Sequence, residues 1–308
     1  MQTTVMKRLL VRGSLILAPV CALLSGPAYS WSSGGHMIVA QIAYDLIAAE
    51  DPRARKEIDR LLAIPVEPLS VTARSVDFVS ASHWADDVKR LEGFTQTANE
   101  HFIDYPFSDD GTVLPADLPQ PDNIVVALEK YVSILKEARS SDQDRAQALR
   151  FVIHFVGDIH QPLHCASRVS AALPEGDRGG NDLMIRHTVG NAHPQIKLHG
   201  YWDSGLDSFP KEGGHFAPPP LELIAPAAAA IRSAYTLDLA WKQGGPTNFA
   251  GWAKESEQIA TAFVYHGIVA LQVPGDDYIA EGVRTAEYRV LTAGYRLAAL
   301  LEDIWPNT

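Results

Sequence analysis

The densest group of side chains that can bind a metal lies in one short segment, FVIHFVGDIHQPLH, at residues 151–164. His154 and Asp158 are four residues apart, so a helix places them on one face with their side chains about 6 Å apart. Pro162 ends such a helix and lets the chain turn His164 back toward the same region. The segment therefore predicts a helix that ends beside a cluster of metal ligands.

Further histidines and aspartates occur at His36 and in the short segments 83–87 and 101–104. His199 and Asp203 form a second pair that is four residues apart, like His154 and Asp158. A single pair of this kind is more often a hydrogen bond on a helix surface, but several in one chain favour a metal site. Imidazole and carboxylate without thiolate is the ligand set of zinc sites that perform hydrolysis. The motifs of P-loop proteins, serine hydrolases and HExxH zinc proteases are absent from the sequence.

The first 30 residues have the pattern of a secretory signal peptide. Basic residues at positions 7, 8 and 12 precede an apolar run at 15–24, and small residues at 28 and 30 favour cleavage after Ser30. The apolar run is short for a bilayer span, so a retained anchor is the weaker interpretation. We expect an exported protein, periplasmic or secreted, that begins at Trp31 and keeps no membrane anchor after processing.

Cysteine usage and charge restrict the mature chain further. Only Cys165 remains after processing, so no internal disulfide can form, and the hydrophobic core, bound metal or both must stabilise the chain. We interpret Cys165 as a buried thiol rather than a zinc ligand, and His160 as a hydrogen-bonded core histidine. The formal net charge of −11 argues against a basic surface that clamps duplex DNA.

Apolar periodicity predicts a mainly α-helical single domain at residues 31–308. Helices are expected at 36–49, 52–62, 70–90 with a break near 80, 123–138, 144–159, 220–234, 251–264 and 280–301. The proline-containing segment 104–122 is expected to form a loop, and short runs at 183–185 and 195–198 a small β-hairpin.

These motifs resemble the S1/P1 nuclease family, whose members are zinc-dependent nucleases specific for single strands and related in fold to bacterial zinc phospholipases C. The matching segments cover nearly the whole mature chain, and they are 31–36 (WSSGGH), 84–86 (WAD), 101–104 (HFID), 154–164 (HFVGDIHQPLH), 179–181 (GGN) and 199–203 (HGYWD). The resemblance implies a helical phospholipase C/P1 nuclease-like fold.

The resemblance also implies three zinc ions. Their ligands would be Asp86, His101, His154 and Asp158 for the first ion, His164, His199 and Asp203 for the second, and Trp31, His36 and the shared Asp158 for the third. Trp31 would bind through its amino nitrogen and its carbonyl oxygen. Because that amino group is free only after cleavage behind Ser30, the predicted cleavage site and the predicted metal site support each other.

Side chains beside the ligands acquire roles from the same resemblance. Asp104 would orient or deprotonate the attacking water, and Lys89 would stabilise charge on the phosphoryl oxygens. Phe102 would stack on a base, and Asn181 would form a hydrogen bond with a base edge. The alternatives are a solvated Asp104, a Lys89 on a helix surface and a Phe102 in the core.

Together these features predict a phosphodiesterase with three zinc ions that acts as a monomer and hydrolyses single-stranded RNA or DNA to 5′-nucleotides, with 3′-nucleotidase activity left open. One alternative is a zinc-dependent phospholipase C, against which Asp203, where the phospholipases carry Glu, and the GGN segment at 179–181 both argue. Another is a zinc-binding protein without turnover, but the chain has no His-rich low-complexity segment.

Overall fold

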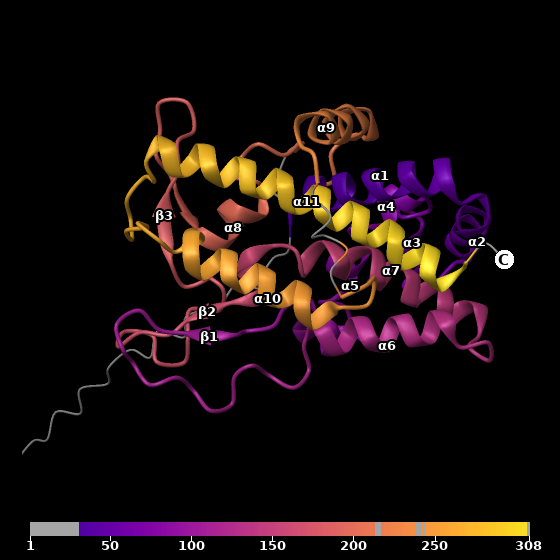
Figure 1. The fold of residues 1–308 in the computed structure, drawn as a ribbon, viewed down its shortest axis with the longest axis horizontal. Coiled ribbons are helices and arrows are strands. Elements are labelled where there is room, and N and C mark those ends of the chain that lie inside the picture. The colour runs from indigo at the N-terminus through magenta and orange to yellow at the C-terminus, as the bar shows by residue number, and fades with distance from the viewer. Residues whose placement is uncertain (1–30, 213–216, 238–241, 243, 307–308) are drawn as a thin grey trace, which may run out of the picture.

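Four long helices form the centre of the fold in a computed structural model (Figure 1), and they are α1 (Ser33–Glu50), α6 (Ile124–Lys136), α7 (Asp142–Asp158) and α11 (Asp276–Ile304). The structure describes residues 31–212, 217–237, 242 and 244–306, so the predicted signal peptide at 1–30 lies outside the described residues. Helix α1 packs along α11, α6 packs along α7, and α7 contacts both α1 and α11. Residues 148–167 are buried without interruption, which places the end of α7 in the interior.

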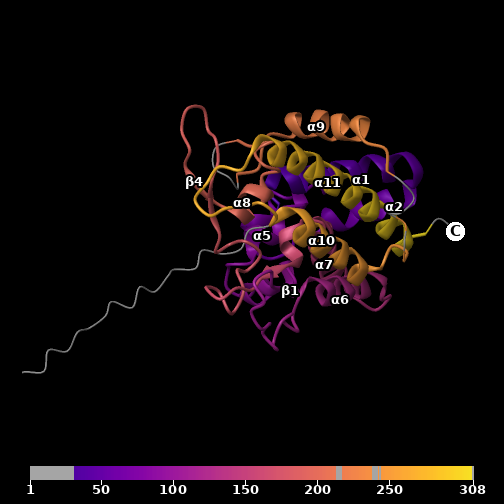
Figure 2. The same cartoon turned by 60° about the vertical axis from the view of Figure 1, so that its left-hand side comes forward.

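The remaining long helices cover this centre. They are α2 (Pro52–Leu62), α9 (Leu221–Ala234) and α10 (Phe249–Ile259), which continues into one π-helical turn, η4 (Ala260–Val264). Helix α2 begins at Pro52 because the Asp51 carboxylate accepts hydrogen bonds from the backbone N–H groups of Arg53 and Ala54. Figure 2 shows α9 on the outer side of α11 and α1, on the opposite side of the molecule from α6. The prediction of a mainly helical single domain is therefore confirmed.

The predicted helix at 70–90 is wrong in its extent, because three short helices occupy this stretch. They are α3 (Leu69–Thr72), α4 (Phe78–Ala81) and α5 (Trp84–Val88). Asp77 starts α4 anew through a reciprocal cap with Ser80. The Thr72 hydroxyl donates to the Val66 carbonyl and accepts from the Trp84 indole N–H, which holds α3 and α5 as separate pieces. Local caps and one buried hydroxyl thus interrupt the helical pattern.

Short strands and helical turns surround the end of α7. The predicted hairpin is confirmed as β3 (Met184–Arg186) paired antiparallel with β4 (Gln195–Lys197). A second pair, β1 (Pro106–Phe107) parallel to β2 (Ser167–Arg168), lies partly within the segment predicted as a loop. The 3₁₀ turns η1 (Thr95–His101) and η2 (Pro162–Cys165) and the short helix α8 (Leu198–Asp203) complete this region.

Two hydrophobic clusters meet at these turns. The larger cluster joins α1, α6, α7 and α11, and the smaller one contains Leu163, Ile185 and Trp202 beneath the hairpin. Leu163 belongs to the smaller cluster, whereas Cys165, two residues later, belongs to the larger one. The turn η2 therefore lies at the junction of the two clusters.

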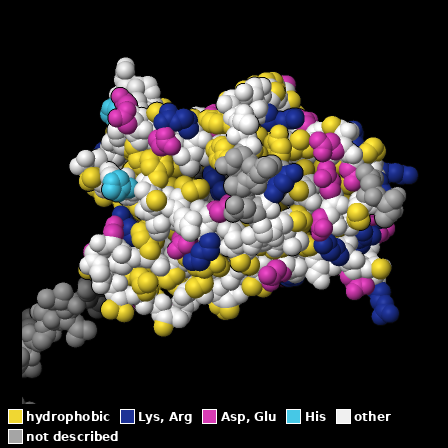
Figure 3. Space-filling model, viewed as in Figure 1, with side chains coloured by type: hydrophobic (Ala, Val, Ile, Leu, Met, Phe, Trp, Pro, Cys, Tyr) yellow, Lys and Arg dark blue, Asp and Glu magenta, His cyan; other side chains and the backbone are white. Residues whose placement is uncertain are grey.

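The surface viewed in Figure 3 carries basic and acidic side chains interspersed with apolar ones. Among the described residues, no helix combines the length and the apolar character needed to cross a bilayer.

Candidate metal centre

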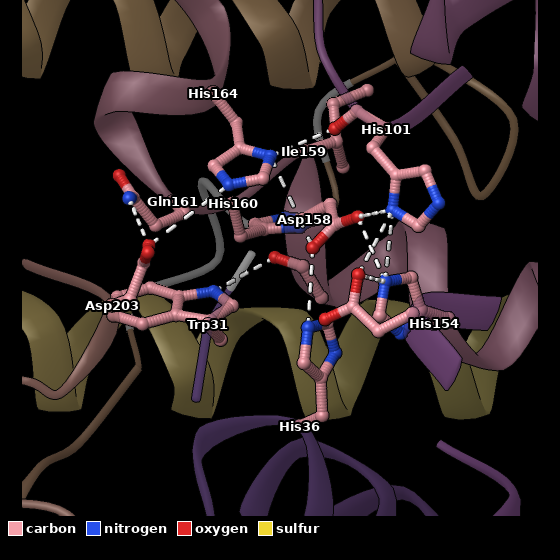
Figure 4. Close-up of polar contacts among 12 residues, drawn as sticks. Trp31, His36, His101, His154, Asp158, Ile159, His160, Gln161, His164 and Asp203 are labelled. Atoms are coloured by element: carbon pink, nitrogen blue, oxygen red, sulfur yellow. Dashed lines mark hydrogen bonds and ion pairs between the residues drawn. The ribbon is translucent and has the colours of Figure 1, made fainter. Parts of the chain in front are cut away.

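Three clusters of histidine and aspartate side chains meet around the C-terminal end of α7 (Figure 4). We name them the Asp86 cluster (Asp86, His101, His154), the His36 cluster (His36, His154, Asp158) and the Asp203 cluster (His164, His199, Asp203). Within each cluster the nitrogen and oxygen atoms that could bind a metal all lie within 4.8 Å of one another. Segments that are far apart in the sequence, from α1 to α8, thus converge on one region.

Asp158 is the central carboxylate of this region (Figure 4). Its Oδ2 lies 2.9 Å from His101 Nδ1 and 3.0 Å from His154 Nε2. Its Oδ1 lies 3.2 Å from His36 Nε2. The spacing of four residues in α7 brings His154 to Asp158, and Asp86 Oδ1 lies 3.6 Å from His154 Nε2. Asp158 therefore joins the Asp86 cluster to the His36 cluster.

The Asp203 cluster is built from η2 and α8. His164 Nε2 and His199 Nε2 lie 3.2 Å apart, and Asp203 Oδ1 lies 4.0 Å from the first and 3.6 Å from the second. The side-chain amide of Gln161 donates a 2.7 Å hydrogen bond to Asp203 Oδ1 and holds this carboxylate in place.

Backbone carbonyls orient three of the imidazole rings. The Nδ1–H groups of His154, His164 and His199 donate to the carbonyl oxygens of Ser82, His101 and Gly179 at 2.6, 2.7 and 2.7 Å. Hydrogen bonds of this kind fix the tautomer and leave Nε2 with a lone pair that faces its cluster. A neutral imidazole with a free lone pair on Nε2 is the form of histidine that can bind a metal through that atom.

The charge state and the unsatisfied atoms of the clusters fit a bound cation. Within the described residues, His36 Nε2 and Asp158 Oδ1, which lie 3.2 Å apart, and Oδ2 of Asp203 are buried without a hydrogen bond. A buried polar atom without a partner costs about 1–3 kcal/mol, so a chain rarely places several together. Burial lowers the pKa of His36 to about 4 and that of His101 to about 3, which keeps both rings neutral at pH 7. Neutral imidazoles and carboxylates are the donors that zinc prefers.

Close packing at α7 fixes the position of His36. A Cβ atom on Gly157 would lie 2.7 Å from His36 Nδ1, so only glycine allows this approach. The His36 ring also stacks on the His154 ring, with 3.9 Å between the ring centroids. The ring is therefore in close contact with both the backbone of α7 and a second imidazole.

Trp31 lies at the same site, next to the start of α1. Its indole Nε1–H donates to the Gly157 carbonyl at 2.9 Å, and the side chain is fully buried. The following backbone N–H, that of Ser32, donates to the carbonyl of Asp203 at 2.8 Å. The first described residues are thus attached both to α7 and to α8.

A pocket of about 300 Å³ adjoins the Asp203 cluster, and its lining includes Lys89, Phe102, Asp104, Leu163, Arg178 and His199. Three of the residues predicted to act on substrate, Lys89, Phe102 and Asp104, therefore share one pocket. Lys89 Nζ donates to Asp86 Oδ1 at 2.5 Å. Burial raises the pKa of Asp104 to about 7, and the negative charge of Asp177 adds to the effect.

Asn181 is not among the residues that line this pocket. The residue is 3% exposed, and its side-chain Nδ2 donates to the Arg178 carbonyl at 2.9 Å. The residue of this loop that reaches the pocket is Arg178, which the sequence analysis did not select. The sequence signal for it is the pair of glycines at 179 and 180, both with positive φ, which mark a tight turn.

The residues set aside as structural are buried within the fold. His160 donates through Nδ1 to the Val156 carbonyl at 2.7 Å and accepts at Nε2 from Arg296 at 3.0 Å, so it is a hydrogen-bonded core histidine as predicted. Cys165 is a free, buried thiol, and burial raises its pKa above the usual range.

Buried histidine and aspartate clusters that border a small pocket in a helical fold define a class of metal-binding hydrolases. The sequence model of the S1/P1 nuclease family matches residues 31–306, and the chain belongs to this family. It is 26% identical to nuclease P1 of Penicillium citrinum over 290 residues, which cover 89% of this chain and 97% of that protein. It is 25% identical to nuclease S1 of Aspergillus oryzae over 306 residues (94% and 97%) and to endonuclease 3 of Arabidopsis thaliana over 295 residues (93% and 92%).

Proposed function

We propose that this protein is a zinc-dependent phosphodiesterase that cleaves single-stranded RNA or DNA to 5′-nucleotides, with removal of 3′-phosphates from nucleotides as a second activity to be tested. The observation that carries the proposal is the junction of three His/Asp clusters with a pocket that contains Lys89 and Asp104. Family membership supports nucleic acid as the substrate.

The three clusters would hold three zinc ions. Asp86, His101, His154 and Asp158 would bind the first ion, the Asp203 cluster the second, and His36, Asp158 and the backbone of Trp31 the third. Bound zinc acts as a Lewis acid and lowers the pKa of water. The amino nitrogen of Trp31 becomes available only if the chain is cut after Ser30, so the proposal includes removal of residues 1–30 and export.

Asp104 and Lys89 would act on the substrate from the pocket. A carboxyl group whose pKa is near 7 can accept a proton from the attacking water and return it to the leaving oxygen at neutral pH. The Lys89 ammonium, buried and fixed on Asp86, would place a positive charge beside the phosphoryl oxygens as negative charge builds on them. These two side chains thus supply a proton acceptor and a fixed cation.

The size of the pocket favours one nucleotide unit of a flexible strand. A volume of about 300 Å³ lies at the lower end of the range for ligand sites. Phe102 provides an apolar wall on which a base can stack, and such stacking needs an unpaired base. A duplex holds its bases paired and stiff, so we expect single strands to be preferred.

The test uses mature protein that begins at Trp31, with its metal content measured by elemental analysis. Cleavage of single-stranded RNA, single-stranded DNA, duplex DNA, a 3′-mononucleotide and phosphatidylcholine would be measured with and without a chelator. About three zinc ions per chain and chelator-sensitive cleavage of single strands would support the proposal. Zinc binding with lipid turnover, or with no turnover, would contradict it and favour a phospholipase C or a zinc-binding protein.

A matched pair of variants tests the role of the pocket carboxylate. Asp104→Asn should lower kcat strongly without loss of metal, because Asp104 is proposed to move a proton rather than to bind zinc. The control is Asp109→Asn, which changes an exposed carboxylate in the same loop that lies 3.8 Å from Arg168 Nη1. Equal activities of the two variants would refute the role of Asp104.

A further inference from the structure

We propose that Arg178 binds a second phosphate group of the substrate, next to the one that is cleaved, and so makes the enzyme prefer strands over molecules with a single phosphate. The inference rests on the proposed function, because it assigns a specificity residue to the same pocket.

Arg178 shares the pocket with the residues proposed to act on the cleaved phosphate. The pocket lining includes Arg178 together with Lys89, Asp104 and Phe102. Lys89 is fixed on Asp86, which belongs to the Asp86 cluster, so its charge is directed to the reaction centre. Arg178 contacts no cluster side chain in the described structure. The guanidinium of Arg178 is therefore a second cationic side chain in the pocket, and it does not pair with any of the candidate metal ligands.

The guanidinium of Arg178 is positioned with one edge still available. Nε and Nη2 donate to the two carboxylate oxygens of Asp182 at 2.8 and 2.6 Å. Within the described residues, Nη1 has no hydrogen-bond partner, and the side chain is 43% exposed. A guanidinium held in this way presents a planar donor to an incoming anion at a small cost in side-chain entropy.

The backbone that carries Arg178 is held rigidly at the site. Arg178 itself has a φ of +54°, a conformation that costs a non-glycine residue free energy. The turn is kept by hydrogen bonds from Arg178 N–H to the Ser167 hydroxyl (3.2 Å) and from the Asn181 amide to the Arg178 carbonyl (2.9 Å). The next residue, Gly179, accepts the hydrogen bond from His199, so the same turn orients a proposed zinc ligand. Arg178 is therefore fixed relative to the metal centre.

A nucleic acid strand is the ligand that suits this arrangement. A strand carries one phosphate per nucleotide, so a substrate that places one phosphate at the reaction centre brings the next one to the surroundings of the pocket. Arginine recognises phosphate through several parallel N–H donors, and this contact is independent of base sequence.

The experiment compares three DNA dinucleotides that differ only in the number and position of phosphates. TpT contains only the phosphate that is cleaved, pTpT adds a 5′-phosphate, and TpTp adds a 3′-phosphate. For zinc-loaded wild type we expect one of the two phosphorylated dinucleotides to have a higher kcat/KM than TpT. In Arg178→Ala this preference should fall by about tenfold, whereas kcat/KM for TpT should change less than about twofold.

Salt dependence gives a second readout. Loss of one phosphate contact should reduce the slope of log kcat/KM against log salt concentration by about 0.7 for the preferred dinucleotide only. Arg284→Ala is the matched control, because it also removes an arginine from an exposed ion pair, with Glu281, but lies outside the pocket. It should leave all three kcat/KM values unchanged.

The outcomes separate this inference from the proposed function. If wild type cleaves the dinucleotides but Arg178→Ala lowers kcat/KM equally for all three, Arg178 does not bind a second phosphate and the inference is wrong, while the proposed function stands. If wild type cleaves none of them nor longer single strands, both fail. Zinc content of Arg178→Ala reports damage to the turn, and in that case Arg178→Gln decides: it removes the charge but keeps a long polar side chain, and an undiminished phosphate preference overturns the inference.

Discussion

Gly157→Ala is a single-methyl change that should remove one metal ion and leave two. The new Cβ would lie 2.7 Å from His36 Nδ1 and 3.0 Å from its Cε1. Contacts between such atoms are normally about 3.5 Å, so the ring must move by roughly 0.8 Å. Because one face of His36 stacks on His154 at 3.9 Å and its Nε2 lies 3.2 Å from Asp158 Oδ1, a shift of the ring changes its position in the cluster.

The free energies involved are modest, but the geometric tolerance of a metal ligand is narrow. Overpacking of a core costs about 1–3 kcal/mol, and replacing a helical glycine by alanine returns about 1 kcal/mol. We therefore expect the free energy of unfolding of the metal-free protein to fall by about 0–2 kcal/mol. Metal–ligand distances tolerate only about 0.2 Å, so a shift of His36 by roughly 0.8 Å should abolish binding at the His36 cluster.

The assay combines elemental analysis with denaturant unfolding. Gly157→Ala should bind about two zinc ions per chain instead of about three and should lose most of its activity. Gly294→Ala is the control, because its Cβ would lie 2.5 Å from Ile42 Cγ2 in the contact between α11 and α1, away from every ligand. It should lose stability and keep its full metal content. Three tightly bound ions in Gly157→Ala would refute the reasoning.

Three further predictions follow from the same structure. Asp158→Asn removes the carboxylate shared by two proposed ions, so zinc content should fall and activity should drop by more than about 100-fold; full activity with unchanged metal content would exclude the shared ligand. One extra residue before Trp31 should block its amino nitrogen and lower the zinc content by about one ion relative to protein that begins at Trp31, as measured by elemental analysis; equal zinc contents would rule out this ligand. Glu255→Gln should lower the free energy of unfolding at pH 7 by about 1–2 kcal/mol, because Glu255 pairs with Arg296 at 2.6 and 2.7 Å.

The effect of Glu255→Gln should depend on pH with a definite sign. Burial opposes ionisation of Glu255, but Arg296 and Arg289 outweigh it and lower the pKa of this carboxyl group. A lowered carboxyl pKa stabilises the folded state above the pKa of the unfolded chain, and this stabilisation is lost as pH falls through the folded value. Unfolding curves of wild type and variant should therefore converge below about pH 4. A constant difference between pH 7 and pH 3 would show that the charge of Glu255 does not contribute.

Much of the helical fold could be predicted because its helices carry local signals. The range predicted for α2 is the observed one, since Asp51 and Pro52 define its start within the sequence itself. Helix α7 was predicted from its apolar pattern and from Pro162. The division of residues 70–90 into three short helices was not predicted, because it depends on contacts such as that of Thr72 with Val66 and Trp84.

The candidate ligand residues could be selected from the sequence because short motifs carried both the helical spacing and the resemblance to the family. The pairs at 154/158 and 199/203 and the HFID segment at 101–104 were recognisable motifs, and the structure brings the predicted His and Asp ligands into three clusters. The pocket lining was harder to predict, because Arg178 reaches it only through a turn with positive φ. Gln161 was also missed, since its contact with Asp203 depends on the packing of α8 against η2.

The position of the clusters at the end of α7 has a consequence for the charges that this region can accommodate. The C-terminal end of a helix carries a partial negative charge of about half an elementary charge, and His154 and Asp158 lie in that last turn. Together with the ionised carboxylate of Asp86, this end of the macrodipole favours a bound cation over an anion. A phosphate bound in this region would therefore rely on bound cations and on the Lys89 ammonium to offset the partial negative charge of the helix end.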